Sequence, residues 1–202
     1  MPVLSREEFD AIEFDAAASG DHQTAARRMS KLAVIGTQTD SMPRSEAFLR
    51  AGEQWLMADD PAAAASGFRL AMADGGPVFV DPRVPLARAL FLMDKPAEAQ
   101  SLLDKLRAEG RHDPRMCDLV AELLVERSDL SGALDWATAG VELSLERRRG
   151  SEGAAQSGPG IEATSGSDDA EAELRLLLSL RYRIRNDLGL PEDSYDALLD
   201  EA

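Results

Sequence analysis

A short polar break followed by an alanine recurs four times along this chain, and this repetition limits the folds that the chain can adopt. The breaks separate stretches with helical periodicity and read SGD, ADDP, MDKP and RSDL. The alanines that follow them are spaced by 39, 35 and 34 residues, and they are Ala25, Ala64, Ala99 and Ala133. Aromatic residues make up only 5% of the chain, which favours helix-on-helix packing over a sheet. The pattern therefore predicts an all-α fold built from pairs of helices.

The residues around these alanines carry a resemblance to a known family. The second segment contains Phe48, Ala51, Gly52 and Trp55 before its break and Ala64, Phe68 and Ala71 after it. This order resembles the tetratricopeptide repeat, whose 34-residue unit has Leu-Gly and an aromatic on the first helix and Ala-x3-Phe on the second. The first segment departs from that pattern at Glu13, where a small residue is expected. The chain thus resembles a bacterial TPR-like helical repeat protein over residues 5–149.

The resemblance implies a right-handed solenoid of antiparallel helix pairs, with about four pairs over residues 5–149. Residues 150–168 are rich in Gly and Ser, which predicts a flexible linker. Over residues 169–190, four apolar residues at helical spacing share one face, which predicts an amphipathic helix; they are Leu177, Leu180, Ile184 and Leu188. Residues 191–202 form an acidic tail that we expect to fray.

Two positions are open for this C-terminal helix. A stack of repeats needs a helix that covers its last apolar face, so the helix can cap the last pair, Cys117–Leu145. It can also lie in the groove of the stack, with its arginines facing acidic residues, and compete there with a partner. The predicted linker is long enough for either position.

Gly52 lies in the middle of a predicted helix, where glycine costs about 1 kcal/mol relative to alanine. We interpret it as a residue at a helix crossing, opposite Ala64, where a larger side chain would hold the two helices apart. Packing then explains Gly52 without a ligand.

In the family, the first helix of each pair lines a concave groove. The register of this sequence implies that the groove is lined by Leu49, Glu53, Leu56, Val84, Arg88, Phe91, Asp118, Glu122 and Val125. Such a groove is apolar with an acidic end. It would suit a basic or amphipathic helical segment of another protein.

Two functions are compatible with these features. The first is a non-enzymatic protein–protein interaction module that acts as an adaptor, scaffold or chaperone-like protein. The alternative is an acidic regulatory or inhibitory protein that blocks a basic site on an enzyme or nucleic-acid-binding partner. Salt distinguishes them, because a helix bound in an apolar groove should withstand moderate salt, whereas surface mimicry should weaken steeply.

The net charge of −15 argues against nucleic acid and membranes as partners. The sequence shows no signal peptide and only one cysteine, so we expect a cytoplasmic protein. We expect neither a metal nor another cofactor, because His22 and His112 lie in different segments and Cys117 is expected to be a buried thiol. No phosphate-binding loop or hydrolase motif occurs, so we expect no catalytic residues.

Overall fold

The computed structural model describes residues 2–110, 113–155 and 164–199. In this part of the chain there are nine α-helices and one short 3₁₀ helix. Extended pairing is limited here to isolated bridges, Val3 with Thr37 and Thr39 with Met42. The all-α prediction is therefore confirmed for the described residues.

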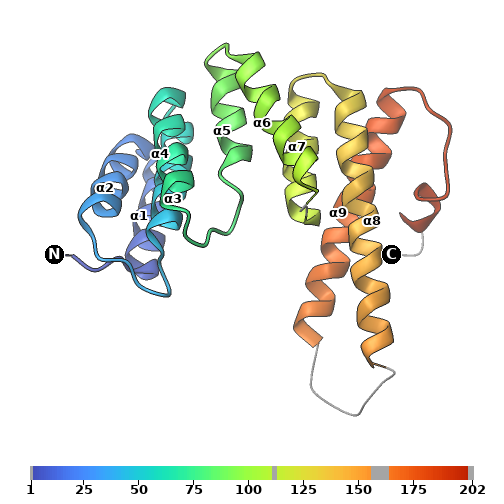
Figure 1. Cartoon of the computed structure of the whole chain (residues 1–202), viewed down its shortest axis with the longest axis horizontal. Helices are drawn as coiled ribbons and strands as arrows, with labels where there is room; N and C mark the ends of the chain where they lie inside the picture. The colour runs from blue at the N-terminus through green and yellow to red at the C-terminus, as the bar shows by residue number, and fades with distance from the viewer. Residues whose placement is uncertain (1, 111–112, 156–163, 200–202) are drawn as a thin grey trace. The chain divides into compact units, whose positions relative to one another are not determined.

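The chain divides into two compact units, Met1–Glu109 and Gly110–Ala202 (Figure 1). The first unit contains α1 (Arg6–Ser19), α2 (His22–Ile35), α3 (Arg44–Met57), α4 (Pro61–Asp74), α5 (Arg83–Leu92) and α6 (Pro96–Glu109). The second contains α7 (Pro114–Glu126), α8 (Leu130–Ala155), α9 (Thr164–Asp187) and the 3₁₀ helix η1 (Asp196–Leu199). The repeat region predicted over residues 5–149 therefore spans parts of both units.

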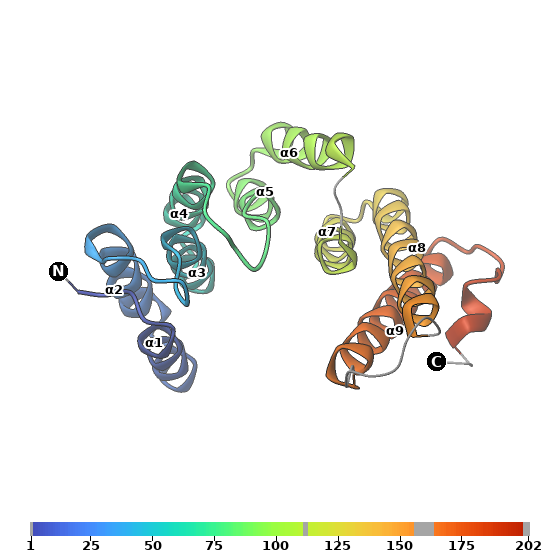
Figure 2. The same cartoon turned by 60° about the horizontal axis from the view of Figure 1, so that its bottom comes forward.

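Within the first unit, each helix packs against the next one along the chain. Figure 2 shows α1, α3 and α5 along one side of this unit and α2, α4 and α6 along the other. The four repeated alanines of the sequence are all buried. Three of them lie in α2, α4 and α6 of this unit, and the fourth lies in α8 of the second unit. These small side chains allow neighbouring helices to pack closely.

Three of the four breaks form the same turn. Asp59, Asp94 and Ser128 adopt left-handed backbone conformations with φ of 58°, 56° and 60°. In each turn the next residue donates its amide hydrogen to the carbonyl oxygen five residues earlier, which is the Schellman arrangement that ends a helix. These 2.9 Å bonds join Asp60 to Trp55, Lys95 to Leu90 and Asp129 to Leu124. The repeat seen in the sequence is thus repeated in the backbone.

Aspartates begin several of the helices. The side chains of Asp21, Asp60 and Asp113 accept hydrogen bonds from backbone amides three residues later, at 3.0, 2.9 and 2.8 Å. Each aspartate satisfies an amide that the first helical turn leaves without a partner. Asp113 is therefore a helix cap, as its position before Pro114 indicates.

The crossing of α3 and α4 is close at Gly52. A Cβ atom built on Gly52 would lie 2.5 Å from Cε1 of Phe68, and one built on Gly67 would lie 3.2 Å from the Cα of Gly52. Gly52 is buried, as expected, but the three atoms that lie nearest to the built Cβ belong to Phe68 and not to Ala64. Close packing at a helix crossing therefore explains the glycine, and Phe68 is the residue that limits the space there.

Glu13 departs from the repeat pattern because it forms an ion pair. Arg50 of α3 is 9% exposed and donates from Nε and Nη2 to the Glu13 carboxylate at 2.8 and 2.6 Å. Its Nη2 also donates to Asp10 at 2.5 Å. An ion pair thus links α1 to α3 where the family pattern has a small residue.

In the second unit, α9 packs against both α7 and α8. A Cβ built on Gly140 of α8 would lie 2.8 Å from Leu177 of α9 and 2.9 Å from Cβ of Cys117 of α7. Gly140 therefore marks the place where the three helices meet. Leu177, Leu180 and Ile184 are buried, as their shared face predicts, whereas Leu188, just beyond the end of α9, is 38% exposed. This packing is the cap arrangement described above, seen within the second unit.

The gap between α8 and α9 is shorter than the linker predicted from the sequence. The helix α8 extends to Ala155 and α9 begins at Thr164, so both helices run into the predicted linker, 150–168. The remainder of that linker, 156–163, lies outside the described residues. In the predicted tail, η1 packs on α9, and Leu198 and Leu199 contact the core that includes Val141 and Leu177. The tail is therefore packed as far as residue 199, rather than frayed as expected.

Candidate interaction surfaces

Six residues of the predicted groove lie in the first unit, and the structure separates them by exposure. Leu49 and Val84 are 1% and 5% exposed, so they belong to the core and offer no surface to a partner. The other four reach solvent to different extents, and they are Glu53, Leu56, Arg88 and Phe91. Of these, Glu53, Arg88 and Phe91 already interact with other residues of the chain. This half of the predicted groove is therefore less open than its register implies.

The other three predicted residues lie on α7 in the second unit. Asp118 and Val125 are half-buried, and Glu122 is exposed. The structure places Asp118, but not Glu122 or Val125, in the lining of a defined hollow. The two halves of the predicted groove thus belong to different units.

This hollow, which we call the acidic hollow, lies between α7 and the first half of α9. It has a volume of about 620 Å³ and is lined by Arg115, Asp118, Leu119, Asp169, Ala170, Ala172, Glu173 and Leu176. Leu176 is 64% exposed, although it is a large apolar side chain. Three carboxylates and one guanidinium surround the apolar residues, so the hollow combines an apolar surface with negative charge.

Asp118 has the most perturbed carboxyl group of this hollow. Burial raises the pKa of this carboxyl group, and the negative charges of Glu122 and Glu173 add to the effect, so that the pKa is about 6. Arg115, one helical turn away, lowers the pKa but does not cancel these effects. At neutral pH the hollow therefore holds a carboxylate whose charge is only partly compensated.

This carboxylate should weaken the fold at neutral pH. Because the pKa of Asp118 is raised on folding, its stabilising contribution is present below pH 3.8 and is lost as the pH rises through about 6. We expect Asp118→Asn to raise the free energy of unfolding at pH 7.5 by about 1 kcal/mol, since partial solvent access weakens the effect. Urea unfolding at pH 4 and pH 7.5 measures it. An equal effect at both pH values would contradict this account.

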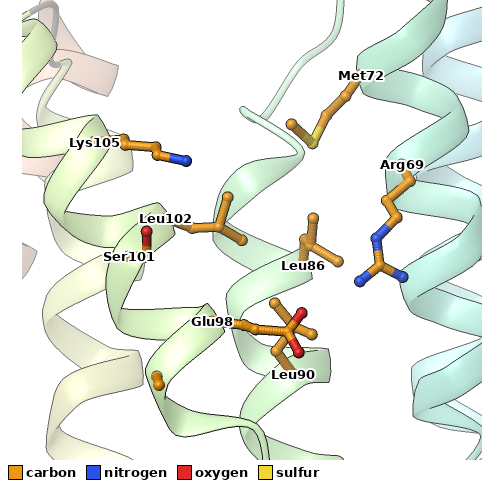
Figure 3. Close-up of a pocket in the computed structure, with 9 residues that line it drawn as sticks. Arg69, Met72, Leu86, Leu90, Glu98, Ser101, Leu102 and Lys105 are labelled. Atoms are coloured by element: carbon orange, nitrogen blue, oxygen red, sulfur yellow. The ribbon is translucent and has the colours of Figure 1, made fainter.

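A second hollow lies in the first unit, and we call it the α4–α6 groove (Figure 3). Its volume is about 520 Å³, and its lining consists of Arg69, Met72, Leu86, Leu90, Ala97, Glu98, Ser101, Leu102 and Lys105. In Figure 3, Arg69 and Met72 extend from α4 on one side, and Lys105 and Leu102 extend from α6 on the other. The register did not indicate this groove, because the family resemblance implies a surface lined by the first helix of each pair, whereas much of this lining belongs to α4 and α6.

The residues considered for metal binding or catalysis have structural surroundings. Cys117 is a buried free thiol, and Nδ1 of His22 lies 2.9 Å from Oε1 of Gln54. His112 lies outside the described residues. Among the residues that the structure describes, no group of three or more His, Cys, Asp or Glu side chains is arranged to hold a metal ion. In the same residues, no helix combines the length and the apolar character that crossing a bilayer requires.

Comparison of the chain with protein-family models, with curated proteins and with solved structures finds no significant match.

Proposed function

We propose that this protein is a non-enzymatic interaction module of the TPR-like type, and that its acidic hollow binds a basic amphipathic helix of another protein. In this proposal the helix pairs are antiparallel and stack as a right-handed solenoid. The repeated Schellman turns, spaced by 35 and 34 residues, support the family assignment.

One observation carries the choice of site: the exposed Leu176 lies in the same hollow as the half-buried Asp118. An exposed leucine gains free energy when a partner covers it, because apolar surface leaves water. A Lys or Arg of that partner would compensate the charge of Asp118, which Arg115 compensates only in part. A helix with an apolar stripe and basic flanks presents both features together.

The net charge of −15 supports the same choice of partner. A strongly acidic protein attracts basic partners and raises the rate of their encounter. Long-range attraction alone would not distinguish one acidic patch from another. The proposal therefore depends on the local combination of Leu176 with the three carboxylates, not on the total charge.

Fluorescence anisotropy with a labelled helical peptide of leucine and lysine tests this proposal. We expect Asp118→Asn/Glu173→Gln to weaken binding about tenfold, which corresponds to about 1.4 kcal/mol. Leu176→Ser should also weaken binding, because it removes apolar surface. Binding should weaken as the pH falls through 6, where Asp118 takes up a proton.

The matched control is Glu7→Gln/Asp15→Asn, which removes the same charge from exposed residues of α1. We expect it to change affinity less than twofold at moderate salt. Equal losses in both double variants, with no effect of Leu176→Ser, would contradict the proposed site. That result would instead support the alternative function, in which the acidic surface as a whole blocks a basic site.

A further inference from the structure

The α4–α6 groove differs from the acidic hollow in the sign of its free charges. Arg69 and Lys105 are exposed, and neither makes a hydrogen bond or an ion pair with any residue that the structure describes. By contrast, Arg50, Arg83 and Arg181 each pair with two carboxylates. The α4–α6 groove therefore has one cation without a partner on each wall, in a protein with 37 acidic and 22 basic residues.

Apolar side chains lie between these two cations. Leu86 and Leu90 of α5 are 3% and 2% exposed and form the floor of the groove. Met72, which is 40% exposed, and the half-buried Leu102 lie beside them on the walls (Figure 3). A partner that covers Met72 and Leu102 would extend the core of the first unit outward.

The groove also contains one carboxylate, that of Glu98. It forms an ion pair of 3.5 Å with Lys95, the residue just before α6. Glu98 and Lys105 are separated by seven residues of α6, which is two helical turns or about 10 Å. The unpaired positive charge is therefore concentrated at Arg69 on one wall and Lys105 on the other.

We propose that the α4–α6 groove binds an acidic amphipathic helix of a second partner protein. Its apolar stripe would contact Met72 and Leu102, and acidic residues on its two edges would pair with Arg69 and Lys105. This site goes beyond the proposed function, because it lies in the other unit and selects a partner of opposite charge.

The acidic C-terminal segment of the chain has its own partners and is not the proposed occupant. Asp193 and Asp196 both pair with Arg181, and Leu198 and Leu199 contact the core of the second unit. The structure therefore favours an external helix for the α4–α6 groove.

Anisotropy of the full chain with a labelled helical peptide of leucine and glutamate tests this inference. We expect Arg69→Gln/Lys105→Gln to weaken binding at least tenfold and Leu102→Ser to weaken it severalfold. The matched control, Arg27→Gln/Lys31→Gln, removes two exposed basic residues of α2 and should change affinity less than twofold. All these positions reach solvent, and circular dichroism verifies that each variant folds.

Three results would overturn the inference: no binding of the acidic peptide by the parent protein, an equal loss in the control, or displacement of the peptide by oleate at lower concentration than by unlabelled peptide. The last result would assign the groove to a fatty acid. The leucine–lysine peptide serves as a second probe, and its binding should not weaken in Arg69→Gln/Lys105→Gln. The two sites are thus tested independently.

Discussion

Gly52→Leu should destabilise the first unit by about 3 kcal/mol or more. The ideal Cβ atom at this position lies 2.5 Å from Cε1 of Phe68, a distance that real Cβ contacts do not reach. The ring of Phe68 is fully buried, so it cannot move aside into solvent. Overpacking of a core typically costs 1–3 kcal/mol, and leucine adds three more carbon atoms beyond the Cβ. For a unit of this size, we expect the melting temperature to fall by about 10 °C or more.

Differential scanning calorimetry of four further variants locates the cause. Ala62→Leu places the same side chain at an exposed position of α4 and should leave the melting temperature nearly unchanged. Phe68→Leu removes the ring, so Gly52→Ala should cost less in that background than in the parent protein. This difference is a coupling free energy between two residues in contact. If Gly52→Leu melts with the parent protein, α3 and α4 do not cross at Gly52.

Arg181→Met should have the largest effect in the second unit. Arg181 lies within 2.6 Å of Asp193 and 3.1 Å of Asp196, donates to Oγ1 of Thr138 at 3.0 Å, and lies over the ring of Tyr195. Its side chain is only 5% exposed, and that of Asp196 is 6% exposed. Removing one member of a buried ion pair leaves the other charge without compensation. Because Arg185 also pairs with both aspartates, we expect a loss of about 2–3 kcal/mol rather than more.

The effect should include release of the C-terminal segment. Chymotrypsin should cleave near Tyr195 faster in Arg181→Met than in the parent protein. Arg183→Met, an exposed neighbour on the same helix, is the matched control and should leave both stability and cleavage unchanged. Cleavage at the same rate in the parent protein and in Arg181→Met would show that this network does not hold the segment in place.

The pH dependence of this network has a definite sign. Hydrogen bonds from Arg181 lower the pKa of Asp193 to about 2. The stability that Asp193 contributes is therefore present above pH 3.8 and is lost as the pH falls through about 2. The difference in stability between Arg181→Met and the parent protein should shrink over this range.

The sequence predicted the local features of the fold well. Helical periodicity, turn residues and small side chains are local signals, so the breaks and the burial of Ala64 and Ala99 followed from them. Long-range pairing has no such signal. The apolar pattern of residues 169–190 leaves Arg181 outside the predicted buried face, and nothing in its sequence neighbourhood marks Asp193 and Asp196 as its partners after a reversal of the chain.

The prediction of which residues line the groove was less accurate than the prediction of the helices, for a related reason. Periodicity shows which residues share a helix face, but it does not show which faces other elements cover. Leu49 and Val84 occupy faces that the fold buries. Leu102 and Lys105 belong to a second helix, and only the structure shows that they meet Arg69 of α4 across a groove. Asp118 was identified by register, whereas its neighbours on α9 were not.

Chemical-shift mapping tests the proposed function most directly. The ¹⁵N-labelled full chain is titrated with the leucine–lysine peptide, and backbone amide shifts are followed by residue. The account predicts that the largest shifts cluster on α7 around Asp118 and Leu119 and on α9 around Glu173 and Leu176, where the acidic hollow lies. Shifts spread evenly over the acidic residues of both units, or confined to residues outside the hollow, would contradict it.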